Sequence, residues 1–396
     1  MELIDKLALK NGRKLLLFVI DGLGGAPRDG KTELENANTP NLNALAKKSI
    51  LGLTDPVSTG ITPGSGPAHL SLFGYDPIKY EIGRGVLEAL GVGMELTERD
   101  IAVRGNFATM DEKGIIVDRR AGRIPSEKNK KICDILREHI EKIEDVDIII
   151  HPGKEHRFVV LFRGDGLYPN VLETDPQEEG NPPIECKAIT EDSEKTARIV
   201  REFIKRAKEV LSLPANMVLL RGFAKYPCLS TMGERFKLSP ACIATYPMYK
   251  GLAKLVGMEV LKTGDTIYDE AETLKRNWNN FDFFYFHVKK TDSLGEDGNF
   301  DGKVKLIEKV DGIIPEVLSL SPDVMVVTGD HSTPAVLKAH SWHPNPFLLF
   351  SEFVIPDGIE SFTERDCAGG GLGRFPSLDV IPLMLAYGLK LKKYGA

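Results

Sequence analysis

Short apolar runs that each lead into acidic residues are the clearest pattern along this chain. Three such runs are residues 14–20 before Asp21, residues 281–288 before Asp292, and residues 323–328 before Asp330 and His331. Apolar runs of this length predict strands buried on both faces, as in a parallel sheet covered by helices.

Helical patterns alternate with these runs. Thr39 and Pro40 form a cap and first-turn pair that predicts a helix through about Ile50. Residues 304–320 have apolar positions at helical spacing, and Pro315 predicts a kink or break within them. The alternation predicts an open α/β sheet, in which ligands bind at the carboxyl ends of the strands, where the aspartates lie.

The middle of the chain lacks the strand-end aspartates and has its own alternation. Its expected helices span about 128–143 and 192–213, and its expected strands span 147–151 and 157–162. We therefore expect a second α/β domain, residues 96–225, to be inserted into a discontinuous domain made of residues 1–95 and 226–396.

Composition narrows the class of protein. A net charge of −6 without a basic tail argues against a nucleic-acid binder, so an anionic ligand must meet a local cluster of positive groups. The N-terminal apolar run, Leu15–Ile20, is too short for a membrane span, and the segment is not a signal peptide. The cysteines are odd in number and form no C-x-x-C pair: Cys133, Cys186, Cys228, Cys242 and Cys367. These features predict a soluble, cytoplasmic protein with reduced thiols.

The strand-end residues suggest a metal site. Asp330 and His331 alone would fit a polar strand end that caps a loop, but His340 follows nine residues later, and Asp21 and Asp292 end strands of the same predicted sheet. Carboxylate and imidazole ligands that converge on one edge suit Mn²⁺, Zn²⁺ or Co²⁺. Without cations, the carboxylates would repel one another.

A candidate nucleophile lies in residues 60–77, GITPGSGPAHLSLFGYDP. Glycine and proline shape a tight turn there, and a short amphipathic helix is expected to begin near Ser65. A hydroxyl at a helix N-terminus lies where N–H groups favour an alkoxide and a phosphate, and metal coordination can activate it. The alternatives are that Ser65 is only an N-cap, or that Thr62 is the nucleophile.

These segments resemble the archaeal-type cofactor-independent phosphoglycerate mutases of the alkaline phosphatase superfamily. The resemblance covers nearly the whole length, in segments that include LLFVIDGLGG (16–25), LENANTPNLNALAKKSILG (34–52), PGSGPAHLSLFGYDP (63–77), IGRGVLEALGVGMEL (82–96), RGNFAT (104–109), DRRAGRI (118–124), EHRFVVLFRG (155–164), TDPQ (174–177), YKGLAKLVGM (249–258), HVKKTD (287–292), TGDHSTP (328–334) and AHSWHPNP (339–346). It implies an alkaline-phosphatase-like, mostly parallel sheet flanked by helices, with the second α/β domain inserted.

The resemblance also implies two groups of metal ligands. The first consists of Asp21, Ser65, Asp330 and His331, with Ser65 as the phosphorylated nucleophile. The second consists of Asp292, His340 and a further histidine in a D-x-x-G-H-D motif, but residues 292–297 read DSLGED, so Glu296 stands where that histidine is expected. A carboxylate there would favour Mn²⁺ or Mg²⁺ over Zn²⁺. His343 and His287 are alternative sources of the missing nitrogen.

Positive residues are the candidates for binding an anionic substrate. Arginine suits both phosphate and carboxylate, although any one of these side chains would also fit a solvated surface role. The candidates in or beside the insertion are Arg119, Arg120, Arg123, Arg157, Arg163 and Arg221. Lys289 is a candidate phosphate contact, and His69 is expected to line the pocket. His156, beside Arg157 in the EHR motif, is the candidate acid and base.

The resemblance implies a mutase that interconverts 2- and 3-phosphoglycerate in glycolysis and gluconeogenesis through a phosphoserine. It implies two divalent metal ions, with Mn²⁺ favoured over Mg²⁺, Co²⁺ or Zn²⁺, and no 2,3-bisphosphoglycerate. The charge and the short apolar runs predict no nucleic-acid partner and no membrane partner. A phosphatase, a phosphopentomutase or a homoserine-kinase-like phosphotransferase would use the same metal and serine residues. A non-catalytic, metal-stabilised binding protein is an alternative of another class.

Overall fold

The computed structural model describes residues 2–227 and 229–395. The chain forms two compact units, one made of residues 1–81 and 229–396 and the other of residues 82–228. We call them the discontinuous unit and the inserted unit. The inserted unit begins at residue 82 and not at 96, because helix α5 (Arg84–Gly91) packs on its strands β3 (Asp100–Met110) and β8 (Met217–Lys225).

The discontinuous unit contains an eight-stranded sheet in the order β10-β9-β11-β1-β12-β13-β2-β14. Its strands are β1 (Leu15–Ile20), β2 (Ser49–Asp55), β9 (Pro240–Ile243), β10 (Glu259–Val260), β11 (Phe283–Val288), β12 (Val324–Thr328), β13 (Asn345–Ser351) and β14 (Gly373–Pro376). Both pairings of β13 are antiparallel and the other pairings are parallel. The predicted α/β class and the mostly parallel sheet are confirmed, as are the three predicted apolar strands, which are β1, β11 and β12.

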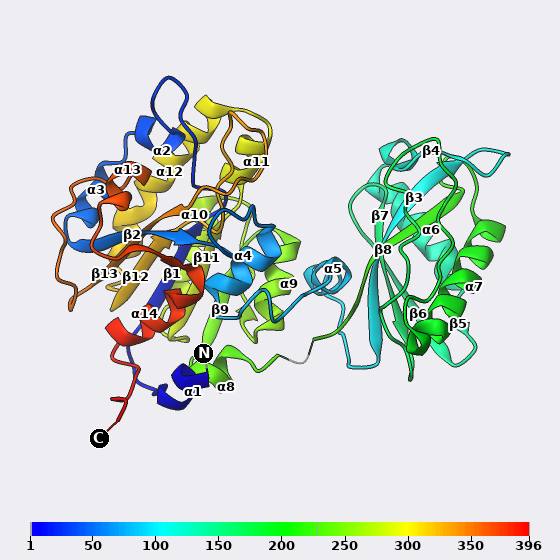
Figure 1. The fold of residues 1–396 in the computed structure, drawn as a ribbon, viewed down its shortest axis with the longest axis horizontal. Helices are drawn as coiled ribbons and strands as arrows, with labels where there is room; N and C mark the ends of the chain where they lie inside the picture. Colours follow the sequence, from blue (N-terminus) through cyan, green and yellow to red (C-terminus); the bar gives the residue numbers. More distant parts are fainter. Residues whose placement is uncertain (1, 228, 396) are drawn as a thin grey trace. The chain divides into compact units, whose positions relative to one another are not determined.

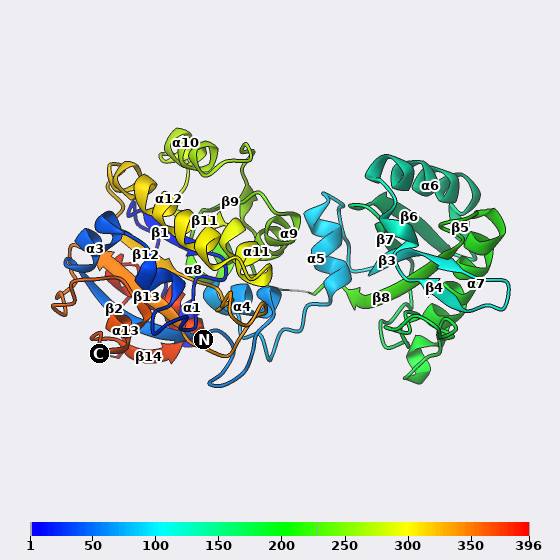
Figure 2. The ribbon, with the colours of Figure 1, turned by 90° about the horizontal axis from the view of Figure 1, so that it is seen from above.

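Helices cover both faces of this sheet (Figures 1 and 2). They are α1 (Glu2–Leu7), α2 (Glu33–Asn36), α3 (Pro40–Ala46), α4 (Ser65–Leu72), α8 (Met232–Phe236), α9 (Pro247–Leu255), α10 (Ile267–Asn277), α11 (Lys290–Glu296), α12 (Phe300–Leu318), α13 (Glu364–Ala368), the 3₁₀ turn η3 (Ser377–Asp379) and α14 (Val380–Tyr387). Side chains alternate across a strand. Phe284 and Phe286 of β11 therefore join the core with α10 and α12, whereas Tyr285 and His287 face the aromatic rings of α4 and α9.

Strand register brings the predicted acidic residues to one edge. Ile20, the last residue of β1, pairs with Val288, the last residue of β11, and Val19 pairs with Thr328, the last residue of β12. Parallel strands that end at the same level direct their following loops to the same edge of the sheet. The segments after β1, β11 and β12 therefore meet there.

Two predicted helices differ from the structure. Helix α3 ends at Ala46, because β2 begins at Ser49, so the predicted end at Ile50 is wrong. Helix α12 continues through Pro315 without a break. Proline cannot donate to the carbonyl four residues earlier, and that carbonyl, on Asp311, instead accepts a hydrogen bond from Asn41 Nδ2 at 3.2 Å.

Helix α4 begins at Ser65, as predicted, but it is not amphipathic. Five consecutive residues of its second half, Ala68–Leu72, are buried. A helix whose later residues are buried anchors its more exposed first turn, which suits a residue that must be positioned accurately.

The inserted unit contains a six-stranded sheet in the order β4-β3-β7-β6-β5, with β8 paired to β3, and its pairings are antiparallel. Besides α5, β3 and β8, its elements are β4 (Ile116–Asp118), η1 (Ala121–Arg123), α6 (Ser126–His139), β5 (Lys142–Ile143), β6 (Val146–Pro152), β7 (Arg157–Arg163), η2 (Glu191–Ser193) and α7 (Glu194–Val210). Helices α6 and α7 cover one face of the sheet (Figure 1), and residues such as Phe107, Phe158 and Phe203 fill the core between them.

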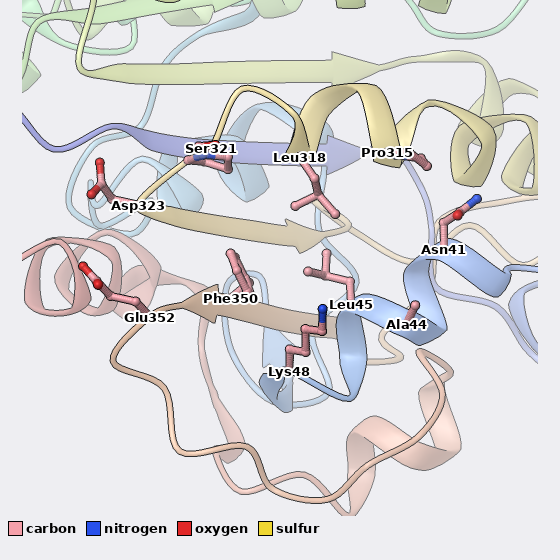
Figure 3. Close-up of a pocket in the computed structure, with 11 residues that line it drawn as sticks. Asn41, Ala44, Leu45, Lys48, Pro315, Leu318, Ser321, Asp323, Phe350 and Glu352 are labelled. Atoms are coloured by element: carbon pink, nitrogen blue, oxygen red, sulfur yellow. The ribbon is translucent and has the colours of Figure 1, made fainter.

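A surface cavity of about 600 Å³ lies in the discontinuous unit, lined by residues of α3, the end of α12 and β13 (Figure 3). Asp323 lines it immediately before β12, whereas Asp330 follows that strand. The cavity is therefore at the opposite end of β12 from the edge where the acidic residues meet.

The helices and the cysteines were also compared with what the sequence predicts. Within the described residues, none of the helices combines the length and apolarity that crossing a membrane requires. The described cysteines are buried and unbridged, namely Cys133, Cys186, Cys242 and Cys367. Cys228 lies outside the described residues.

Candidate active site

Asp21, Asp330 and His331 form a fully buried cluster at the carboxyl edge of β1 and β12. His331 Nε2 lies 3.4 Å from Asp21 Oδ1 and 3.1 Å from Asp330 Oδ2. One ligand atom from each residue fits within 4.8 Å of the others. Asp21 Oδ1 and Asp330 Oδ2 are buried without a hydrogen-bond partner among the described residues. Buried oxygens without donors are what a cation site requires.

A second cluster shares His331 and adds Asp292 of α11 and His340. His340 Nε2 lies 3.5 Å from Asp292 Oδ1, and the rings of His331 and His340 stack at 3.7 Å. His340 donates a hydrogen bond from Nδ1 to the carbonyl of Pro63 at 2.9 Å, which leaves the lone pair of Nε2 free for a ligand. The two clusters together have the composition of a two-metal centre.

Lys289 places its ammonium between carboxylates of the two clusters. Its Nζ lies 3.1 Å from Asp21 Oδ2 and also donates to Asp292 Oδ2. Burial opposes the charge, but Asp21 and Asp292 raise the pKa of Lys289. Burial likewise opposes charge on Asp292, but His340 and Lys289 lower the pKa of this carboxyl to about 2. A permanently positive group thus faces the acidic edge.

The acidic edge carries more negative charge than Lys289 balances. Burial and the neighbouring Asp21 raise the pKa of Asp330 well above its ordinary value. Burial also opposes charge on Asp21, but His287, Lys289 and His331 together hold the pKa of Asp21 well below its ordinary value. A low pKa for Asp21 beside a high pKa for Asp330 is typical of two neighbouring carboxylates that lack a cation between them.

Ser65 is the first residue of α4, and its Oγ lies 3.2 Å from His331 Nε2. The alternative that Ser65 is an N-cap is wrong, because Gly64 holds that position. The competitor Thr62 is exposed. The hydroxyl of Ser65 is therefore the nucleophile candidate that the fold brings to the ligand clusters, at a helix N-terminus that favours anions.

His69 lies beneath Ser65. It is fully buried, its Nδ1 donates to the carbonyl of Ser65 at 2.9 Å, and it lies 3.3 Å from Asp330 Oδ2. Burial, with His287 nearby, lowers the pKa of His69 to about 3, so the ring is neutral at pH 7. Its position supports the first turn of α4 from within the core.

The residue that departs from the expected motif, Glu296, lies at the rim. Its Oε1 is 3.9 Å from His340 Nε2, and its side chain is 54% exposed. Of the alternative nitrogen sources, His287 is buried with Nε2 at 3.3 Å from Asp21 Oδ2. His343 instead pairs with Ser341 Oγ through Nδ1 and stacks on Trp342. Glu296 is thus adjacent to the second cluster but outside its tightest group.

Tyr249 of α9 lies in this site. The sequence does not indicate this, because Tyr249 occupies an ordinary position in a helical pattern. Its ring lies 4.0 Å from that of His287 and 4.6 Å from that of His69. Its hydroxyl is buried and has no hydrogen-bond partner among the described residues. Burial and the charges of Asp21 and Asp330 raise the pKa of Tyr249 well above its ordinary value, so the hydroxyl remains protonated.

The inserted unit has a separate group of positively charged and polar side chains on one face of its sheet. Arg104 of β3 pairs in register with Arg221 of β8, and Asn106 pairs with Arg157 of β7. Arg104 Nε, Arg157 Nε and the nearby His156 Nδ1 are buried without a hydrogen-bond partner among the described residues. Unused donors at neighbouring positions make this face a candidate anion site.

Arg104 is the residue of this face that the sequence does not single out. It is 5% exposed, and its Nη1 lies 3.0 Å from Glu88 Oε1. Burial lowers the pKa of Arg104 to about 10, so it remains charged at pH 7. The available signal is that Arg104 and Asn106 are polar at alternate positions within residues 101–108 of β3, which are otherwise apolar.

The remaining candidates of the inserted unit lie in different surroundings. Burial and the charge of Arg157 lower the pKa of His156 to about 4, so its imidazole is neutral at pH 7. Arg119 makes two hydrogen bonds of 2.8 Å to Asp175, and Arg163 makes two, of 2.7 and 2.8 Å, to Asp100. Arg120 and Arg123 are exposed.

Comparison with known proteins identifies relatives along the whole chain. The sequence profile described as 2,3-bisphosphoglycerate-independent phosphoglycerate mutase matches residues 46–216. A relative from Thermotoga petrophila is 56% identical over 397 residues, covering 100% of this chain and 99% of its own. A relative from Aquifex aeolicus is 55% identical over 407 residues, covering 100% of both. Both carry the name "Probable 2,3-bisphosphoglycerate-independent phosphoglycerate mutase".

Two solved structures share the fold. The PH0037 protein from Pyrococcus horikoshii is 31% identical with a TM-score of 0.83, covering 98% of this chain and 100% of its own. A cofactor-independent phosphoglycerate mutase from Thermoplasma acidophilum is 30% identical with a TM-score of 0.76, covering 95% and 100%. With more than half of its residues identical to full-length relatives, this chain belongs to the family of 2,3-bisphosphoglycerate-independent phosphoglycerate mutases.

Proposed function

We propose that this enzyme is an isomerase that interconverts 2-phosphoglycerate and 3-phosphoglycerate through a phosphoserine on Ser65, without 2,3-bisphosphoglycerate. The reaction would serve glycolysis and gluconeogenesis in the cytoplasm. The observation that carries the proposal is the position of Ser65 Oγ, 3.2 Å from the histidine that belongs to both ligand clusters. The names of the full-length relatives supply the substrate.

The residues fit two divalent cations. The first would be held by Asp21, Ser65, Asp330 and His331, and the second by Asp292, His340 and Glu296. The unpartnered buried oxygens of Asp21 and Asp330 support this fit, and carboxylate-rich ligand sets favour Mn²⁺ over Zn²⁺. When bound, the cations would stabilise the serine alkoxide and the charge of the phosphoryl group in transfer.

The residues of the discontinuous unit have defined roles in this proposal. Ser65 Oγ attacks the substrate phosphorus in line as the bond to the glycerate oxygen breaks, and the proton of the Ser65 hydroxyl passes to that oxygen. The N-terminus of α4 and the ammonium of Lys289 stabilise the phosphoryl oxygens. In the second half of the reaction, the other hydroxyl of glycerate attacks the phosphoserine and restores Ser65.

The inserted unit would recognise the glycerate portion. Arg104, Arg157 and Arg221 offer guanidinium groups of the kind that bind a carboxylate through two hydrogen bonds. His156 is neutral at pH 7. In each half of the reaction its imidazole can therefore accept the proton of the hydroxyl that attacks and pass it to the oxygen that leaves. In this proposal the glycerate portion is bound by Arg104, Arg157 and Arg221, and His156 handles its protons.

An enolase-coupled assay tests the function. Purified enzyme, loaded with Mn²⁺ and free of 2,3-bisphosphoglycerate, is mixed with 3-phosphoglycerate, while inorganic phosphate is measured in parallel. We expect 2-phosphoglycerate to form faster than phosphate is released. Phosphate release without 2-phosphoglycerate would overturn the proposal in favour of a phosphatase.

Metal preference should depend on Glu296. In Glu296→His, imidazole replaces a hard oxygen ligand, so the ratio of Zn²⁺-supported to Mn²⁺-supported activity should rise by about 10-fold or more. The measurement is the mutase rate after reconstitution of metal-free protein with each ion. Asp297→His is the matched control, because it places the same imidazole one residue beyond Glu296, at the C-cap of α11. An equal shift in both variants would exclude Glu296 as a ligand.

Arg104 and Arg163 should behave differently when each is changed to lysine. Lysine cannot provide the forked pair of donors, so Arg104→Lys should raise KM for 3-phosphoglycerate by about 10- to 100-fold. Arg163→Lys should leave KM near the wild-type value, because Asp100 occupies its guanidinium. Steady-state kinetics of both variants checks this. A rise in KM confined to Arg163→Lys would reverse the assignment.

A further inference from the structure

Thr333 lies between the two ligand clusters. Its hydroxyl is 2.7 Å from Asp292 Oδ1, in the second cluster, and 3.0 Å from Nδ1 of His331, which belongs to both. The residue is fully buried. The proposed reaction does not itself use the hydroxyl of Thr333.

The chemistry of the three groups fixes the direction of both hydrogen bonds. An ionised carboxylate only accepts, so the single hydroxyl proton of Thr333 goes to Asp292. The hydroxyl oxygen then accepts the Nδ1–H of His331. His331 is thereby held with its Nε2 lone pair facing Asp21, Asp330 and Ser65.

Three other elements are shaped around Thr333. A side chain at Gly22, whose φ is +63°, would place its Cβ 2.6 Å from Thr333 Oγ1. A Cβ at Gly295 of α11 would lie 2.2 Å from the Thr333 carbonyl. The fully buried Lys303 of α12 donates to that carbonyl at 2.9 Å and to the carbonyl of Gly24 at 3.2 Å. The backbone and the hydroxyl of Thr333 are therefore both held in place.

We propose that Thr333 is a positioning residue that couples the two metal clusters, by holding His331 in one tautomer and orienting Asp292. Binding of one cation then prepares the ligands of the other. The inference rests on the proposed two-metal centre, and it adds a residue that binds neither metal nor substrate. Partners that orient metal ligands in this way usually contribute about 10- to 100-fold to metal affinity.

Mn²⁺ binding to the metal-free protein tests this proposal. Titration followed by the electron paramagnetic resonance signal of free Mn²⁺ gives the number of ions bound and both affinities. The variants are Thr333→Ser, which keeps the hydroxyl, and Thr333→Ala, which differs from it by that hydroxyl alone. Thr333→Val, close in shape to threonine, is a third variant. Circular dichroism and Tm of each variant report whether it folds.

We expect wild type and Thr333→Ser each to bind two ions. For each ion, the affinity of Thr333→Ser should lie within about threefold of the wild-type affinity. Thr333→Ala and Thr333→Val should bind at least one ion about 10- to 100-fold more weakly. If Thr333→Ser is weakened as much as Thr333→Ala, the hydroxyl has no role and the inference is overturned. Equal binding by wild type and Thr333→Ala would also overturn it.

The mutase assay separates this inference from the proposed function. Weaker Mn²⁺ binding in the alanine and valine variants supports the role of Thr333 even if wild type has no mutase activity, a result that would overturn the function alone. A wild-type protein that binds no Mn²⁺ would overturn both proposals.

Discussion

Replacing Ser65 by alanine should lower the mutase rate by about 10⁴-fold or more, because in the proposed reaction Ser65 carries the phosphoryl group between the two hydroxyls of glycerate. The hydroxyl lies 3.2 Å from His331 Nε2 at the first turn of α4. Its loss removes the covalent step and one proposed ligand of the first cation, but it leaves Asp21, Asp330 and His331 in place. Enolase-coupled kinetics with Mn²⁺-loaded protein measures the effect.

Thr62→Ala is the matched control for this variant. Thr62 is a hydroxyl residue of the same segment, but it is exposed. We expect this variant to retain nearly the wild-type rate and Ser65→Ala to retain nearly the wild-type Tm. If Ser65→Ala kept its activity and Thr62→Ala lost it, the nucleophile would have been assigned to the wrong residue.

Removal of divalent cations should have the second largest effect. Stabilisation of transition-state charge by metal ions amounts to several kcal/mol, so chelation should reduce the rate by about 10³-fold or more. Lys289 alone cannot balance Asp21, Asp292 and Asp330, so the metal-free protein should also unfold at a lower temperature. Activity and Tm before chelation, after it and after addition of Mn²⁺ give the result.

Asp330→Asn provides the control for the chelation experiment. It removes one buried carboxylate and keeps nearly the same shape, so its activity should not recover fully on addition of Mn²⁺. Its Tm should depend less on chelation than that of wild type, because less charge is left uncompensated. Activity that survives complete removal of metal from wild type would contradict the two-metal centre.

The meeting of the candidate metal ligands at one edge of the sheet could be predicted from the sequence. Buried parallel strands are continuous apolar runs, so β1, β11 and β12 can be predicted from the sequence. Because these strands are parallel neighbours, the residues that follow them meet at one edge. Asp21, Asp292, Asp330 and His331 are therefore predictable as a group. The start of α4 at Ser65 is also predictable, because Pro63 restricts the preceding backbone and Gly64 allows a tight turn.

Features that depend on partners distant in sequence were not predictable in the same way. Pro315 lies inside α12, and Asn41, far away in the chain, satisfies the freed carbonyl of Asp311. Helix α5 belongs to the inserted unit because of packing against β3 and β8, which no local signal encodes. Arg104 and Thr333 lie in ordinary sequence surroundings, and their importance comes from the buried groups placed opposite them.

The most direct test of the central claim is chemical trapping of the phosphoserine. Mn²⁺-loaded enzyme is mixed with 3-phosphoglycerate, quenched with acid within a single turnover, digested and analysed by mass spectrometry. We predict one added phosphoryl group on the peptide that contains Ser65, and none in Ser65→Ala. Turnover of 3-phosphoglycerate to 2-phosphoglycerate with the phosphoryl group on another residue would contradict the account.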